Sequence, residues 1–126
     1  MIVAISGTPG VGKSAVAKEL EDDGHRVLML DDVAEEHSFV EGEEKGTKIV
    51  NVDKLNEYVK TLKAENNLFL VSHYSHLIDH DAAIVLRCHP EELRRRLKKR
   101  AWREDKMREN LEAEAIDVIT IEALER

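Results

Sequence analysis

The chain has 126 residues, 36% of them charged and 42% hydrophobic, which suits a soluble globular protein of one domain. A formal net charge of −7 argues against a surface that coats nucleic acid without specificity, because such a surface needs an excess of lysine and arginine. The single cysteine, Cys88, excludes an internal disulfide, and the apolar start is too short to span a membrane. These features predict a cytoplasmic protein.

The chain begins with a predicted strand and a predicted helix. Residues 1–6 are an apolar run typical of a buried strand. After a glycine-rich turn, residues 13–23 have the pattern of a helix, with Val16 and Leu20 on one face. Gly24 is the expected stop after this helix.

A second strand is predicted at residues 26–30, and it ends at two acidic residues, Asp31 and Asp32. Asp32 is followed by Glu35 three residues later, which resembles a capping box and predicts a short helix. Residues 38–50 contain glycines and glutamates without a clear period, so we expect a mobile insertion there.

The rest of the chain alternates predicted helices and strands. In order, the predicted elements are a helix over 52–65, strands over 67–72 and 82–88, a helix from Pro90, a charged break at 100–104 and a long final helix to about Leu124. Strands that are apolar along their length and alternate with helices imply an α/β fold, with a parallel sheet covered by helices on both faces.

One motif between the first strand and the first helix carries specific chemistry. The segment from Gly7 to Ser14 reads GTPGVGKS, which fits G-x-x-x-x-G-K-[ST] at every fixed position and in the required strand–turn–helix context. Its glycines let successive backbone N–H groups point at phosphate oxygens, and the helix N-terminus adds partial positive charge. Lys13 is placed to reach the β- and γ-phosphates, and the Ser14 hydroxyl is suited to Mg²⁺. A nucleoside triphosphate site is therefore predicted, rather than a chance glycine-rich turn.

An acid at the end of a neighbouring strand usually orders the Mg²⁺ shell beside such a loop. The third predicted strand runs into FLVSHYSH, and it presents Val71 and His73 where an acid is expected. Asp31 and Asp32, after the second strand, are the nearest substitutes that the sequence offers. We therefore expect Ser14 and Asp31 to be the metal ligands.

The order of four segments resembles the archaeal "putative adenylate kinase" family and its eukaryotic relative, the nuclear adenylate kinase isoenzyme six. These segments are GTPGVGKS, VSHYSHL, VLRCHPEELRRRLKKRAW and RENLEAEAIDVITIEAL, and together they cover nearly the whole chain. The resemblance implies a P-loop NTPase three-layer sandwich and a nucleoside monophosphate kinase that uses ATP and Mg²⁺ and also has ATPase activity. It further implies a role in late maturation of the small ribosomal subunit, through a ribosomal protein of the subunit platform and only indirect contact with ribosomal RNA.

The resemblance also implies roles for particular residues within a single domain, 1–126. Residues 30–50 would be a monophosphate-binding flap and 99–109 a short lid. His73 would place the attacking water or the metal, and Arg100 would contact ATP from the lid. The implied catalytic residues are Lys13, His73 and Arg100, and the implied ATP ligands are Gly10, Gly12, Lys13, Ser14, Ala15 and Arg100.

The sequence departs from the family pattern at several positions. The acid that commonly stands two residues before the histidine is Val71, and a Lys or Arg often found in the flap helix is Glu35. Ala101 replaces a glycine after Arg100, and alanine resists a positive φ. Family members continue beyond the position of Arg126, so we expect a sheet that lacks the last strand and helix.

Two functions remain open at this stage. One is a kinase that moves the γ-phosphate of ATP to a nucleoside monophosphate, and the other is a non-kinase ATPase assembly factor that binds a small-subunit ribosomal protein. No arginine stands between Val27 and Leu86, although a monophosphate acceptor normally calls for a bidentate guanidinium. We therefore expect firm ATP binding, weak hydrolysis and uncertain transfer. A GTP switch would show an N/T-K-x-D signature, which nothing here resembles.

Two further patterns allow more than one interpretation. His73, His76 and His80 have a spacing that lies partly within zinc-site ranges, but no second cluster or cysteine pair supports zinc, and a solvated active-site loop is favoured. The basic run over 94–100 could contact RNA, but a solvated helix face is favoured for all of it except Arg100.

Overall fold

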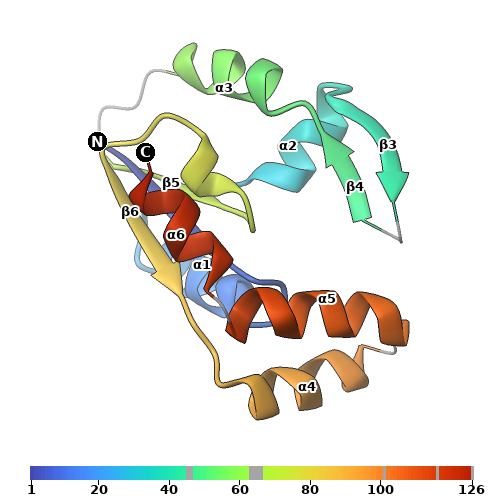
Figure 1. The fold of residues 1–126 in the computed structure, drawn as a ribbon. Helices are drawn as coiled ribbons and strands as arrows, with labels where there is room; N and C mark the ends of the chain where they lie inside the picture. Colours follow the sequence, from blue (N-terminus) through green and yellow to red (C-terminus); the bar gives the residue numbers. More distant parts are fainter. Residues whose placement is uncertain (45–46, 63–66, 101, 116, 126) are drawn as a thin grey trace.

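The computed structural model describes residues 1–44, 47–62, 67–100, 102–115 and 117–125. Four parallel strands form its main sheet: β1 (Ile2–Gly7), β2 (Arg26–Met29), β5 (Leu68–Val71) and β6 (Ala82–Leu86). Their order is β2-β5-β1-β6 (Figure 1). Strand β5 therefore lies directly beside β1, which leads into the segment from Gly7 to Ser14, called the phosphate loop below. The predicted α/β fold with a parallel sheet is confirmed.

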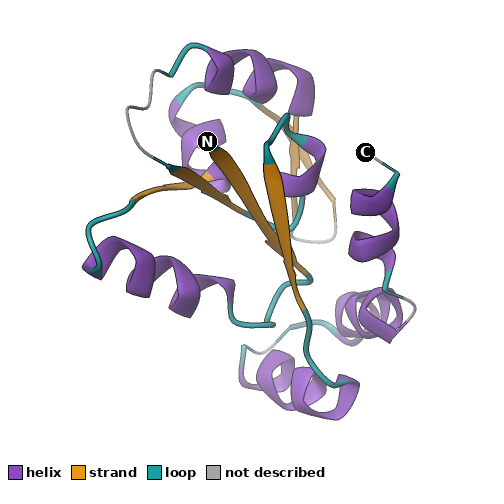
Figure 2. Cartoon of the chain, turned by 90° about the vertical axis from the view of Figure 1, so that its left-hand side faces the viewer, coloured by secondary structure: helices purple, strands orange, loops and turns teal. Residues whose placement is uncertain are grey.

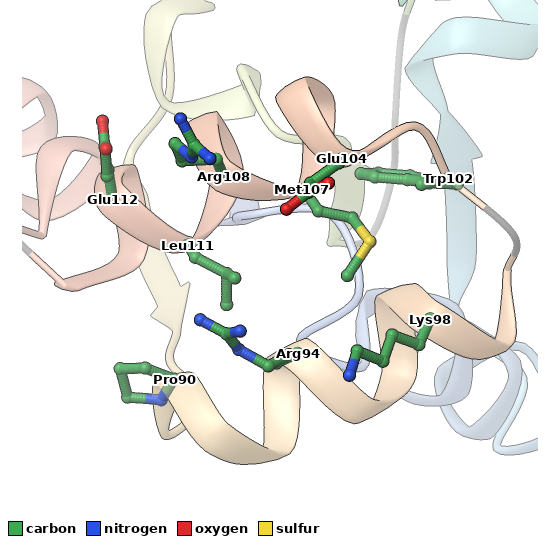
Figure 3. Close-up of a pocket in the computed structure, with 9 residues that line it drawn as sticks. All are labelled: Pro90, Arg94, Lys98, Trp102, Glu104, Met107, Arg108, Leu111 and Glu112. Atoms are coloured by element: carbon green, nitrogen blue, oxygen red, sulfur yellow. The ribbon is translucent and has the colours of Figure 1, made fainter.

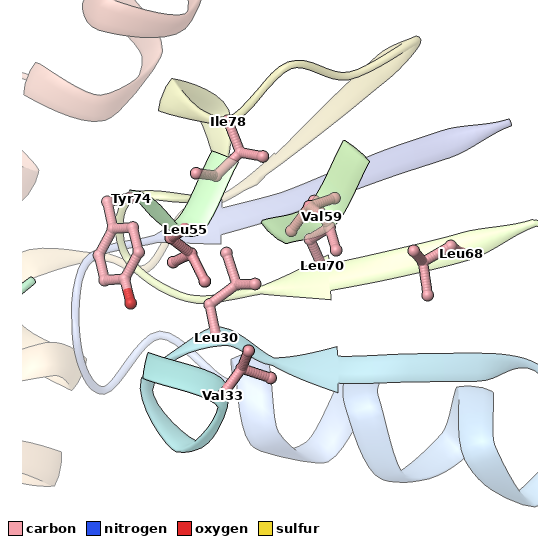
Figure 4. Packing of buried hydrophobic residues seen from close by; sticks show 8 residues of the cluster. All are labelled: Leu30, Val33, Leu55, Val59, Leu68, Leu70, Tyr74 and Ile78. Carbon is pink, nitrogen blue, oxygen red and sulfur yellow. The ribbon is translucent and has the colours of Figure 1, made fainter. Parts of the chain in front are cut away.

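Helices cover both faces of this sheet (Figure 2). The helices beside it are α1 (Lys13–Asp22), α2 (Leu30–Glu36) and α3 (Val52–Lys60). Because successive strand residues point to opposite faces, Leu68 and Leu70 of β5 pack with α2 and α3, in the cluster that Figure 4 shows. Phe69 and Val71 belong to a second cluster, which packs against α1. The sheet is thus the middle of three layers.

The C-terminal helices are joined to the phosphate loop by a third apolar cluster. They are α4 (Pro90–Lys99), α5 (Glu104–Ala115) and α6 (Val118–Leu124), and α4 and α5 lie side by side (Figure 1). Leu93 and Leu97 of α4 are fully buried between Val11 of the loop and the side chains of Met107 and Leu111. This packing places one face of α4 next to the phosphate loop.

The predicted long final helix is wrong, because two helices stand in its place. Asp117 lies between α5 and α6 with φ 59°, in the left-handed region that breaks a helix. Its carboxylate is 2.7 Å from a guanidinium nitrogen of Arg87, and Arg87 also forms an ion pair with the buried Glu114. These contacts hold the end of α5 against the end of β6.

The lack of regular structure expected over residues 38–50 is also wrong, because the described part of this segment forms a pair of strands. These strands, β3 (Val40–Glu44) and β4 (Thr47–Val50), are antiparallel, with a register shift between Val40 and Gly42. The second strand is shorter than predicted, because Leu30 already begins α2. The expected capping box does not form either: Met29 is the N-cap residue of α2, and no side chain caps this end.

Other boundaries agree with the sequence. Gly24 follows α1 with φ 89°, and Pro90 occupies the first turn of α4. The helix predicted over 52–65 ends at Lys60, and the last residues of that range lie outside the described part of the chain. None of the helices among the described residues has the length and apolar character needed to cross a membrane.

Candidate nucleotide site

The phosphate loop has a shape that only glycine allows at particular positions. Gly10 has φ 95° and Gly12 has φ 112°, both in the left-handed region that side chains disfavour. A Cβ at Gly10 would lie 2.9 Å from Leu93 Cδ1, and a Cβ at Gly7 would lie 2.6 Å from Val11 Cγ2. The glycines therefore set both the curvature of the loop and its close contact with α4.

The loop borders a cavity of about 660 Å³. The loop and α1 contribute Pro9, Gly10, Gly12, Lys13, Ser14 and Ala15 to its lining; β2, α2 and the end of β5 contribute Met29, Asp31, Asp32, Val71, Ser72 and His73; and α4 with its cap contributes Arg96, Lys99 and Arg100. Every residue predicted to bind the nucleotide, the metal or the attacking water is in this set. The structure therefore brings the predicted site residues to one cavity.

Lys13 lines the cavity and is largely buried. Its Nζ donates a hydrogen bond to the carbonyl oxygen of Gly7, at the end of β1. Burial, followed by the positive charge of Arg100, lowers the pKa of Lys13 to about 8, and the negative charges of Asp31 and Glu114 only partly oppose this effect. At pH 7 the ammonium therefore keeps its proton in most molecules, in a poorly solvated place that favours an anionic partner.

His73 follows β5 at the edge of the same cavity. Burial lowers the pKa of His73 below its ordinary value of 6.5, and the nearby negative charge of Asp31 only partly opposes this effect. The imidazole is therefore neutral at pH 7, so one ring nitrogen can accept a hydrogen bond. This protonation state suits the predicted role in orienting water.

The alternative zinc site does not form. His76 is buried, and its Nδ1 lies 2.9 Å from Ser6 Oγ on β1. His80 is turned back to the chain, with its Nδ1 2.7 Å from the carbonyl oxygen of Ile78. Within the part of the chain that the structure describes, no three His, Cys, Asp or Glu side chains are grouped to hold a metal ion. The interpretation as a solvated active-site loop fits His73, which lines the cavity, and is wrong for His76, which is a core residue.

The basic run over 94–100 divides between two surfaces. Arg94 and Lys98 line a separate cavity of about 760 Å³ between α4 and α5, and Trp102 and Leu111 line the same cavity (Figure 3). Arg96, Lys99 and Arg100 line the cavity beside the phosphate loop, whereas Arg95 lines neither cavity and pairs with Glu92.

Arg96 is the residue that sequence reasoning missed. Its guanidinium donates to the carbonyl oxygen of Gly10 at 3.1 Å and to Glu92 Oε1 at 3.3 Å. It stands four residues before Arg100, and residues four apart share one helix face. That spacing was the signal that could have assigned Arg96 to the site together with Arg100.

Ser14 and Asp31 are the predicted Mg²⁺ ligands, and both line the cavity. A hydroxyl and a carboxylate are oxygen donors of the kind that Mg²⁺ prefers, and this ion commonly takes only one or two protein ligands beside substrate phosphates and water. The donor set therefore fits Mg²⁺ bound together with ATP. The position of Asp31 differs from the prediction, since it lies in the first turn of α2 rather than at a strand end.

Comparisons with known proteins agree with this geometry. A family model described as an AAA domain matches residues 3–117. The "Putative adenylate kinase" of Archaeoglobus fulgidus is 45% identical over 99% of this chain and 67% of its own length, and that of Pyrococcus furiosus is 46% identical over 99% of this chain and 69% of its own length. Among solved structures, a deoxyadenosine kinase from M. mycoides matches over 89% of this chain and 81% of its own, with 19% sequence identity and a TM-score of 0.46.

Proposed function

Because the chain belongs to the archaeal "putative adenylate kinase" family, we propose that it is an ATP-dependent phosphotransferase of the adenylate kinase type that also hydrolyses ATP. The observation that carries the proposal is the cavity in which Lys13 and Ser14 of the phosphate loop meet His73 and the arginines of α4. Residues 30–50 act as the monophosphate-binding flap and 99–109 as the lid; within these ranges, 45–46 and 101 lie outside the described residues.

Each side chain has a defined task in this proposal. The backbone N–H groups from Gly10 to Ala15 bind the phosphate oxygens, and Lys13 neutralises the β- and γ-phosphates. Arg100, at the C-cap of α4, stabilises the charge of the transferring group when the lid closes. His73, neutral at pH 7, accepts a hydrogen bond from the attacking water.

Mg²⁺ would be held by Ser14 and Asp31 together with the nucleotide. When bound, it neutralises the negative charge of the β- and γ-phosphate oxygens. The chain itself contributes an oxygen donor from each side of the cavity, one at the start of α1 and one in the first turn of α2.

The acceptor side favours water over a second nucleotide. Glu35 of α2 forms an ion pair with Lys48 of β4, which belongs to the hairpin of β3 and β4. The positive charge of Lys48 is therefore already neutralised by Glu35. Asp31 and Asp32 add negative charge beside this pair. Since a monophosphate carries negative charge itself, hydrolysis is expected to exceed transfer.

The second candidate function is a non-kinase ATPase that binds a small-subunit ribosomal protein in the late maturation of that subunit. The family resemblance supports this role, and the acidic acceptor side favours it over transfer. ATP binding and slow hydrolysis would drive docking and release, and any effect on ribosomal RNA would be indirect.

One coupled assay tests these functions together. Purified protein is given Mg²⁺ and ATP alone, then ATP with each nucleoside monophosphate, then ATP with the platform ribosomal protein. Formation of a nucleoside diphosphate from an added monophosphate supports the kinase. Phosphate release that only the ribosomal protein stimulates supports the assembly factor. Absence of ATP binding in every mixture would contradict both.

A further inference from the structure

Tyr74, in the loop after β5, is linked by a hydrogen bond to Asp31 of α2. Its side chain is part of the buried cluster in Figure 4 and the residue is only 7% exposed. Its hydroxyl donates a hydrogen bond of 2.8 Å to Asp31 Oδ1, across 43 positions of sequence. A buried tyrosine hydroxyl needs a hydrogen-bond partner, and here the partner is a carboxylate that lines the ATP cavity.

The backbone that carries Tyr74 is held by bonds of its own. Its N–H donates to Ser72 Oγ at 3.1 Å, and Ser72 Oγ lies 2.8 Å from Ser75 Oγ. Two residues further on, the N–H of His76 donates to Ser6 Oγ on β1 at 2.8 Å. The tyrosine hydroxyl is therefore fixed relative to the sheet without the help of the carboxylate.

Asp31 gains a fixed orientation from this bond. It lies in the first turn of α2, where no side chain caps the helix end. An ionised carboxylate has about four lone-pair sites, so accepting one hydrogen bond leaves capacity for a cation. A donor fixed on the core side restricts rotation of the carboxylate and holds it at the cavity.

The pair of Tyr74 and Asp31 lies near Val71, the position at which an acid is expected from the sequence. Val71, at the end of β5, lines the same cavity and stands where the sequence resemblance leads us to expect an acid. Tyr74 is three residues further along the same loop. The loop that lacks a carboxylate of its own therefore supplies a donor that holds a carboxylate from the neighbouring element.

We propose that Tyr74 is a positioning residue, whose hydroxyl orients Asp31 toward the Mg²⁺ that accompanies ATP. The inference rests on the proposed ATP site and deepens it. Tyr74 and Asp31 together take the place of the acid that is absent at position 71.

The test compares two substitutions that each remove one phenolic oxygen. Tyr74→Phe removes the donor to Asp31, and Tyr58→Phe removes the hydroxyl of the chain's other tyrosine, which packs beside the same cluster from α3. Binding of a fluorescent ATP analogue is measured over a range of Mg²⁺ concentrations and in EDTA. Because changes to groups that orient a metal ligand typically weaken metal affinity about tenfold or more, Tyr74→Phe should need about tenfold more Mg²⁺ for half-maximal effect.

The expected pattern differs from that of a purely structural role. Affinity for the analogue in EDTA should stay unchanged in Tyr74→Phe, and Tyr58→Phe should match the wild type throughout. An unchanged Mg²⁺ requirement in Tyr74→Phe, in a protein whose wild type responds to Mg²⁺, overturns the inference and leaves the ATP site standing. A wild type that binds no analogue overturns the proposed function and this inference with it.

A double-mutant cycle asks whether Tyr74 acts through Asp31. Asp31→Asn keeps an oxygen that can accept the hydrogen bond but removes the charge, so it should weaken the Mg²⁺ response on its own. Adding Tyr74→Phe to Asp31→Asn should then change the Mg²⁺ requirement less than twofold, because the effects of residues that act through one contact do not add. A further tenfold loss in the double variant would show that Tyr74 acts by another route, and the inference would be wrong.

Discussion

The two walls of the cavity beside the phosphate loop carry opposite charges. On the α4 side, Arg96, Lys99 and Arg100 face the loop. On the side of α2 and β5, the charged groups are Asp31 and Asp32, next to a neutral His73. Lys13 lines the same cavity, and its pKa responds to both walls, since Arg100 lowers it and Asp31 raises it.

This difference separates the tasks of the two walls. Cations on the α4 side suit the phosphate chain of one nucleotide, whose charge they offset. Carboxylates and a neutral imidazole on the other side suit a metal ion and a water molecule, but they repel a second phosphate group. The comparison thus predicts a site that holds ATP well and transfers its phosphate to water more readily than to a nucleotide.

The largest expected effect is at the centre of the cavity. Lys13→Ala should lose about 3 kcal/mol of ATP affinity, because it removes the charged donor to the β- and γ-phosphates. Lys18→Ala, on the exposed face of α1, is the matched control and should bind as the wild type does. Isothermal calorimetry measures both. Wild-type affinity in Lys13→Ala would contradict the assignment of the phosphate loop.

The next effect tests the wall of α2 and β5. His73→Ala should lower ATP hydrolysis about 100-fold while ATP affinity stays within about twofold, because the role proposed for the histidine is to orient water and not to hold the nucleotide. His25→Ala removes an exposed imidazole elsewhere and serves as the control. Equal hydrolysis rates in wild type and His73→Ala would assign this residue to packing alone.

The pH profile of the same reaction gives a second check on His73. Its pKa is lowered from 6.5, so the neutral acceptor persists down to that lowered value and is lost only as the pH falls through it. Wild-type hydrolysis should therefore not decline between pH 8 and about 6.5 through this group, and it should fall at more acidic pH.

The α4 wall gives a smaller effect. Arg100→Ala should lower turnover about tenfold and ATP affinity less, because we propose that the guanidinium contributes most when the lid closes. Arg95→Ala is the control on the same helix, since Arg95 is exposed and pairs with Glu92. A fall in melting temperature without a change in turnover would make Arg100 structural, and the charge difference between the walls would then not matter for catalysis.

The sequence predicted the centre of the site better than its walls. The phosphate loop could be read because its residues are contiguous and only glycine tolerates the backbone angles at Gly10 and Gly12. The contact between Tyr74 and Asp31 joins residues 43 positions apart, and no local pattern reports it. The β3–β4 hairpin was missed because its exposed strands lack an apolar face and shift register near Gly42.

Helix α4 shows where a pattern was present but not sufficient. Its apolar positions, Leu93 and Leu97, were recognisable by their spacing and are fully buried. Its cations occupy consecutive positions over 94–96, so composition alone describes one basic run. Only packing of α4 against Val11 decides that Arg96 faces the phosphate loop and that Arg94 faces α5.

The smallest net effect is expected for Val71→Asp, because two consequences oppose each other. Val71 is 1% exposed and packs with Ile5 and Ala17, so a carboxylate there without a partner costs more than a buried neutral polar group, which costs about 1–3 kcal/mol. The same position lines the cavity, where Mg²⁺ and ATP would offset the new charge. The variant should therefore melt below the wild type when free and recover part of that loss when Mg²⁺ and ATP are bound.

Val71→Asn separates charge from polarity in this experiment, since it has nearly the same shape without the charge. We expect Val71→Asp to hydrolyse ATP about two- to threefold faster than the wild type, and Val71→Asn to show no gain. Melting curves with and without Mg²⁺ and ATP, alongside hydrolysis rates, measure both parts. If the two variants recover equally on binding Mg²⁺ and ATP, the charge at position 71 has no metal partner. Asp31, on the neighbouring helix, would then be the acid that completes this wall of the cavity.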